Sequence, residues 1–158
     1  MENQPSGSGV TWVPVAEFFV PGEPKAQPRV RVVRGGHAYT PATAKGFKER
    51  IYWEAKSHCP QPVGDSDTPI RVDITFFLKR PKRLCRKKDP QFPIYCTKKP
   101  DRDNLDKSVL DALTGAGVLL DDAQVVSGTL EKYYHAIGEG PGVFISIYMG
   151  RFFVAGEA

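Results

Sequence analysis

The sequence lacks the features of a membrane-bound or secreted protein. No apolar run approaches the roughly 18 residues of a transmembrane helix, and residues 1–9 contain neither a basic residue nor an apolar segment typical of a secretory signal. Cysteine is also scarce: the chain has three, an odd number without a CxxC pair, which argues against a disulfide framework and a zinc ribbon. These absences predict a reducing, cytoplasmic location and no membrane partner.

Length and composition are those of one globular domain. The 158 residues are 41% hydrophobic and 25% charged, which is enough apolar material for a core without disulfides or structural metals. The polar, Gly/Ser-rich start of the chain predicts a disordered tail over residues 1–13. We therefore expect a single folded domain over residues 14–158.

Positive charge is concentrated in one segment. Residues 79–102 contain ten basic and two acidic residues, a net charge of +8, whereas the other 12 basic and 16 acidic residues leave −4 for the rest of the chain. Such a segment is typical of proteins that bind nucleic acid phosphates, although a solvated loop without a ligand is the alternative. The residues expected to contact DNA are Lys82, Arg83, Arg86, Lys87, Lys88, Lys98, Lys99 and Arg102. Prolines within residues 79–100, called the basic loop below, predict little regular structure.

Local patterns in the first half of the chain predict a strand, a hairpin and a helix. Residues 15–20 are apolar and end at a Pro-Gly pair, as expected of a strand. Residues 30–40 contain Gly35-Gly36 between two extended runs, which indicates a hairpin. Residues 41–57 are predicted to be a helix with Thr40 as its cap and a proline at its first position.

The second half gives the clearest periodicities. Apolar and polar residues alternate over Ile70–Leu78, and strands are also expected over residues 125–135 and 143–149. Residues 103–115 are predicted to be a helix whose apolar stripe is Leu105, Val109, Ala112, Leu113 and Ala116. The element order predicts a mixed sheet with two helices packed on it, an α/β (α+β) domain.

Carboxylates gather at the start of that second helix. Asp101 and Asp103 lie two residues apart, and oxygen ligands of this kind suit Mg²⁺, which neutralises and orients a phosphate during phosphodiester cleavage. Lys107 follows Asp103 by four residues, so both lie on one helix face and the lysine can reach a bound phosphate. Residues 117–122 are just long enough to return along the helix, so Asp122 can join the site.

Each of these residues also has a structural interpretation. Asp103 can simply cap the helix, and Lys107 can form a weak surface ion pair with Asp103 or Asp111. Asp121 and Asp122 can be a turn before a strand. An Asp-x-Asp pair also occurs in nucleotide-sugar transferases, but the short chain and the basic loop disfavour that class.

The string from Asp101 to Val126 is more specific than its parts. It combines Asp-x-Asp-Asn-x-x-Lys, Asp-Ala-Leu-x-x-Ala-Gly and Asp-Asp-x-Gln-Val at fixed spacing, and it closely resembles the signature of the RusA family of Holliday junction resolvases. A looser similarity covers residues 21–29 and 37–40, which look like the opening of phage-type members. The basic loop departs from the family pattern because it is longer and more basic than the linker of compact members.

The resemblance implies a magnesium-dependent homodimeric endonuclease that resolves four-way DNA junctions by paired symmetric nicks, in DNA recombination and repair. Mn²⁺ is an expected substitute ion, and a bacterial or phage source is implied. Asp101, Asp103 and Asp122 match the family's catalytic, metal-binding carboxylates, and Lys107 matches its catalytic lysine. A less selective nuclease acting on forks or flaps, and a junction-binding module that does not cut, remain alternatives.

Overall fold

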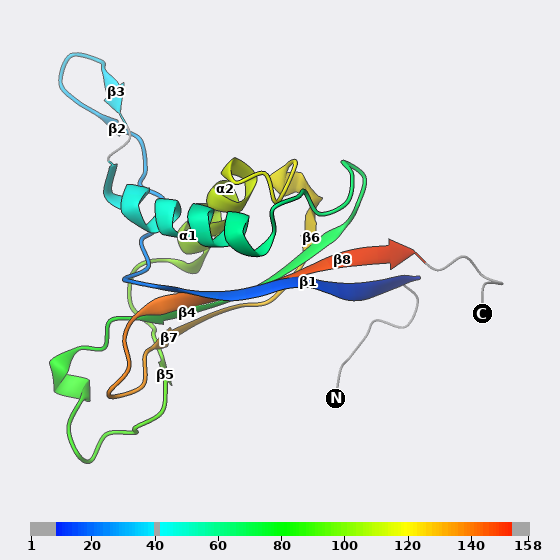
Figure 1. The fold of residues 1–158 in the computed structure, drawn as a ribbon. Helices are drawn as coiled ribbons and strands as arrows, with labels where there is room; N and C mark the ends of the chain where they lie inside the picture. Colours follow the sequence, from blue (N-terminus) through cyan, green and yellow to red (C-terminus); the bar gives the residue numbers. More distant parts are fainter. Residues whose placement is uncertain (1–8, 40–41, 153–158) are drawn as a thin grey trace.

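Two helices cover one face of a mixed six-stranded sheet, and the opposite face carries no helix (Figure 1). The computed structural model describes residues 9–39 and 42–152. The helices are α1 (Lys45–His58) and α2 (Arg102–Gly115). The sheet contains β1 (Val10–Pro21), β4 (Ile70–Leu78), β5 (Ile94–Tyr95), β6 (Val125–Ser127), β7 (Leu130–Tyr134) and β8 (Gly142–Phe152). The predicted mixed sheet with two helices is therefore confirmed.

Strand order follows from the connections. The sheet runs β1-β8-β4-β7-β5, with β6 paired to the start of β4. β8 is antiparallel to both β1 and β4, whereas β6 and β7 are parallel to β4. Parallel neighbours need a long crossover, and the basic loop and α2 supply it between β4 and β7. The predicted metal ligands and Lys107 all lie on this crossover.

The core lies between the helices and the sheet. The five alternating apolar residues of β4 are all buried, and α1 contributes Phe47, Ile51 and Ala55. The predicted stripe of α2, from Leu105 to Ala116, is buried as well. Because these stripes fix which side of each helix faces the sheet, Arg102, Asp103 and Lys107 of α2 face solvent. No helix in the described residues is long and apolar enough to cross a membrane.

The element boundaries differ from the sequence prediction at the start of the chain. β1 begins at Val10, so residues 10–13 belong to a strand instead of a tail, because they pair with the end of β8. Residues 1–8 lie outside the described residues. The first helix is preceded by a 3-10 turn at Ala42–Ala44 and begins at Lys45. The predicted cap, Thr40, and the following proline also lie outside the described residues.

The predicted strand over residues 125–135 is divided at Gly128. This glycine has φ +150°, and a Cβ atom there would lie 2.0 Å from the carbonyl oxygen of Val72. Only glycine tolerates both the backbone angle and the close approach to β4. The alternation of apolar residues does not predict this break, because the break results from the contact between Gly128 and β4.

Candidate active site and nucleic-acid interface

The start of α2 presents two carboxylates to solvent. Asp101 occupies the N-cap position with an extended backbone, but its side chain makes no capping hydrogen bond. Its carboxylate instead lies 3.2 Å from Nζ of Lys99 in a surface ion pair. Asp103 lies exposed in the first helical turn, where the helix dipole favours negative charge. Among the described residues neither side chain caps the helix, so the carboxylate of Asp103 and the second oxygen of Asp101 are available to a cation.

A lysine from the sheet fixes the backbone that leads into α2. Nζ of Lys132 donates to the carbonyl oxygens of Lys98 and Pro100, at 2.7 and 2.6 Å. Lys132 lies on β7, which is itself paired with β4. The end of the basic loop and the beginning of α2 are therefore held against the sheet, and Asp101 has a defined position.

Lys107 is exposed on the outer face of α2, as the helical spacing predicts. Within residues 9–39 and 42–152 its ammonium group forms no ion pair, so the surface pairing with Asp103 or Asp111 is not seen. A free ammonium group one turn after Asp103 can interact with a phosphate there.

The turn that carries Asp122 is held by one buried glutamine. Oε1 of Gln124 accepts hydrogen bonds from the backbone N–H groups of Leu120 and Asp121, at 2.9 and 3.2 Å. Its Nε2 donates to the carbonyl oxygens of Asp65 and Thr68, at 2.7 and 3.2 Å. The glutamine thus ties the aspartate turn to the loop before β4. Its amide oxygen accepts two hydrogen bonds and its amide nitrogen donates two, so the hydrogen-bonding capacity of the side chain is filled.

The aspartate turn is also stabilised from within. Asp121 caps the 3-10 turn Asp122–Gln124 by accepting from the N–H of Ala123 at 2.8 Å. This backbone hydrogen bond, with one from the Asp122 side chain, lowers the pKa of Asp121. The structural interpretation of this pair as a turn is therefore correct for Asp121. The side chain of Asp122 remains exposed.

The carboxylates are distributed along α2 in two hollows. Asp122 lines a hollow of about 350 Å³ with Asp111 and Asp121, beside the second half of α2. Asp103 lines another hollow with Asp106, against the chain from Val125 to Leu130. Burial raises the pKa of Asp106. Eight helical residues, about 12 Å, separate Asp103 from Asp111.

The convergence of Asp101, Asp103 and Asp122 on one metal ion stays a prediction. Over residues 9–39 and 42–152, no three His, Cys, Asp or Glu side chains come together to hold a metal ion. Asp122 returns to α2, as chain length allowed, and lines a hollow there with Asp111. The donor chemistry suits Mg²⁺, since all the groups are carboxylates and Mg²⁺ commonly takes only one or two of them directly. The full ligand set stays a prediction.

The basic loop is ordered by a buried arginine that the sequence did not single out. Arg80 is 4% exposed, and its guanidinium donates to the carbonyl oxygens of Leu84, Pro90 and Phe92 at 2.8, 2.8 and 3.1 Å. Leu84 and Ile94 add a small apolar cluster against the end of the sheet. The eight side chains predicted to contact DNA are all exposed: Lys82, Arg83, Arg86, Lys87, Lys88, Lys98, Lys99 and Arg102. The exposed cations of the loop are therefore carried by an ordered backbone.

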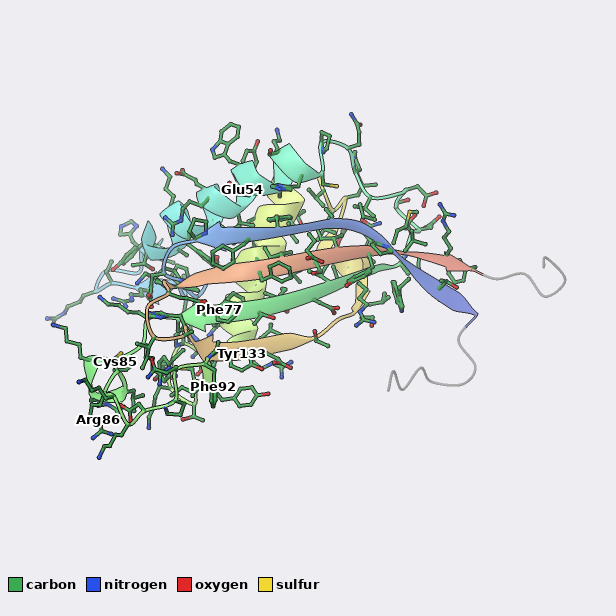
Figure 2. The ribbon with its side chains drawn as sticks, turned by 60° about the horizontal axis from the view of Figure 1, so that its bottom comes forward. Glu54, Phe77, Cys85, Arg86, Phe92 and Tyr133 are labelled. Carbon is green, nitrogen blue, oxygen red and sulfur yellow. The ribbon has the colours of Figure 1, made fainter. Side chains whose placement is uncertain are left out.

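Aromatic rings extend from the basic loop across the open face of the sheet. Tyr95 stacks on Tyr133 with ring centroids 4.6 Å apart, and Tyr133 stacks on Phe77 at 6.1 Å. Figure 2 brings this face forward, with Phe77 and Tyr133 on the sheet and Cys85 and Arg86 at the outer end of the loop. Tyr95 and Phe92 are each 67% exposed. Their rings are accessible to a planar ligand such as an unstacked base.

Comparison with known proteins assigns the chain to a family. The family model described as Endodeoxyribonuclease RusA matches residues 21–148 of the 158, which includes the basic loop, α2 and the aspartate turn. No curated protein matches the sequence. The match covers well over half of the chain and agrees with the motif at the start of α2, so this protein belongs to the RusA family of endodeoxyribonucleases, enzymes that resolve Holliday junctions.

Proposed function

We propose that this protein is a Mg²⁺-dependent endonuclease that resolves four-way DNA junctions by paired symmetric nicks, in recombination and repair. The observation that carries the proposal is the arrangement at the start of α2. The half-buried carboxylate of Asp101 and the exposed carboxylate of Asp103 follow directly on the ordered basic loop, and Lys107 lies one turn further along the helix. Carboxylates beside a cationic surface suit a metal-assisted attack on a phosphodiester.

Asp101, Asp103 and Asp122 are the proposed metal ligands. When bound, Mg²⁺ would neutralise the phosphate and supply an activated water, with Mn²⁺ as an alternative ion. Lys107 would stabilise negative charge on the phosphate oxygens through its free ammonium group. The basic loop would hold the neighbouring phosphates and so fix the position of the scissile bond, while contributing little sequence preference.

A homodimer is part of the proposal. A four-way junction has two-fold symmetry, and a two-fold dimer presents two equal sites to it, as paired nicks require. The partner is therefore branched DNA, in the cytoplasm of a bacterium or of a phage-infected host. A nuclease that acts equally on forks or flaps would need the same chemistry, and a binding module would need only the basic surface.

The test compares labelled junction, fork and duplex substrates at one salt concentration, with Mg²⁺, Mn²⁺ or EDTA, on denaturing gels. Wild-type protein is expected to nick opposite strands of the junction only when a divalent ion is present. Asp103→Asn and Asp122→Asn are expected to retain junction binding and lose cleavage. Asp67→Asn serves as a matched control, because Asp67 is also exposed but lies on the loop before β4.

The outcomes separate the three functions. Equal cleavage of junction and fork would replace the resolvase with a less selective nuclease. Retention of the junction without cleavage in either metal would leave a binding module. Normal cleavage by Asp103→Asn would remove Asp103 from the metal ligands.

A further inference from the structure

A two-stranded hairpin projects from the body of the protein beyond α1 (Figure 1). It consists of β2 (Arg31–Val32) and β3 (Ala38–Tyr39), joined through Gly35 and Gly36, which have φ of +116° and +84°. We call residues 29–39 the hairpin arm. The arm and the basic loop both extend from the end of the molecule that lies opposite the start of β1 and the end of β8 (Figure 1).

The large apolar side chains of the hairpin arm are exposed and do not belong to the hydrophobic core. Val30, Val32 and Tyr39 are 62%, 72% and 48% exposed. Arg31 pairs with Tyr39 and Val32 with Ala38, so adjacent pairs point to opposite faces of the ribbon, and both faces are open to solvent. An isolated hairpin is marginally stable in water. A ligand that covered these apolar side chains would therefore stabilise the arm.

The charge of the arm identifies the kind of ligand. Residues 24–48 contain six basic residues and no acidic one. Arg29, Arg31 and Arg34 are exposed, and none forms an ion pair or a side-chain hydrogen bond in the part of the chain that the structure describes. Guanidinium groups bind phosphates through paired hydrogen bonds. This is a second cationic surface, separate from the basic loop.

The base of the arm is fixed to the start of α2. The backbone N–H of Gln27 donates to the carbonyl oxygen of Asn104 at 2.9 Å, and Nζ of Lys48 donates to Oε1 of Gln27 at 3.0 Å. From Gln27 to the tip at Arg34, an extended chain reaches about 20 Å. At about 3.4 Å per base pair, that span corresponds to about six base pairs of duplex measured from Asn104, the neighbour of Asp103 on α2.

We propose that the hairpin arm binds a groove of duplex DNA about six base pairs from the scissile phosphate. The major groove admits a two-stranded ribbon, and it would cover both faces of the arm at once. The three arginines would contact the flanking phosphates, and the valines would pack on sugars and bases. The inference rests on the proposed function, because it requires the chain to act on branched DNA with duplex arms.

The first test measures the salt dependence of junction binding in EDTA, where cleavage does not occur. The variant Arg29→Ala/Arg31→Ala/Arg34→Ala is expected to reduce the slope of log K against log salt by about 2.7 per protomer, from three lost phosphate contacts. The corresponding triple lysine variant should keep most of the slope. Arg151→Ala is the control, since Arg151 is exposed on β8 at the other end of the sheet and should leave the slope unchanged.

The second test locates the contact. Junctions carry uncharged methylphosphonates either five to eight or fifteen to eighteen base pairs from the branch point. Neutralising the nearer set is expected to weaken wild-type binding and to have little further effect on the triple alanine variant. A slope equal to that of Arg151→Ala, or equal sensitivity of both proteins to the nearer set, would overturn the proposal.

Two results keep this inference distinct from the proposed function. If the protein binds junctions with an arm-dependent slope but never cuts them, the proposed function fails and the arm remains a DNA-binding element. If the triple alanine variant changes only the oligomeric state on size-exclusion chromatography with light scattering, the arm contacts a second copy of the chain and the proposal is wrong.

Discussion

Replacing Arg80 is expected to loosen the basic loop without unfolding the domain. Its guanidinium makes three hydrogen bonds to loop carbonyls, and hydrogen bonds that involve a charged group contribute about 1.5–3 kcal/mol each. When the loop opens, water hydrates the carbonyls and the guanidinium, which offsets part of the energy of these hydrogen bonds. We therefore expect the Arg80 substitution to lower the free energy of local opening by about 3 kcal/mol. Since 1.4 kcal/mol is a factor of ten, amide exchange should accelerate about 100-fold.

Hydrogen exchange measured by mass spectrometry tests this expectation. Arg80→Lys keeps the charge but cannot supply the planar set of donors that reaches three carbonyls. Peptides from residues 82–95 should therefore exchange faster in Arg80→Lys, while peptides from β4 and β8 remain protected. Arg83→Lys, at an exposed position of the same loop, is the control. Unchanged exchange in Arg80→Lys would show that the apolar cluster around Leu84, and not the arginine, orders the loop.

Three further predictions concern the sheet, α2 and the loop aromatics. Gly128→Ala is expected to lower the free energy of unfolding by about 2–4 kcal/mol, from a strained φ and contact with β4; urea denaturation should show no such loss for Gly140→Ala, where a Cβ meets nothing within 4 Å. Burial raises the pKa of Asp106 above its unfolded value, so ionisation opposes folding. Asp106→Asn should therefore stabilise the protein at pH 7, and this gain should vanish well below the unfolded pKa of about 3.9; an equal gain at pH 3 would refute the reasoning. Phe92→Ala and Tyr95→Ala are expected to weaken junction binding more than duplex binding in gel-shift titrations, and equal losses would show that the rings do not stack on unpaired bases.

The periodic elements and the spacing of the motif could be predicted from the sequence. Alternation marked β4 with its correct bounds, and the apolar stripe of α2 fixed which side of that helix is buried. Burying that stripe leaves Asp103 and Lys107 on the outside. These features are local, because one turn or one pleat sets the direction of each side chain.

Contacts between distant segments were decided only by the tertiary structure. Gln124 ties the aspartate turn to the loop before β4, and in this turn Asp122 lines a hollow with Asp111 of α2. Arg80 became a loop-ordering residue because three carbonyls from later in the chain meet its side chain. Chain length set only the limits of where these groups could go. Their positions depend on hydrogen bonds and packing between segments that are far apart in the sequence. Hydrophobic periodicity predicts local secondary structure and does not report such contacts.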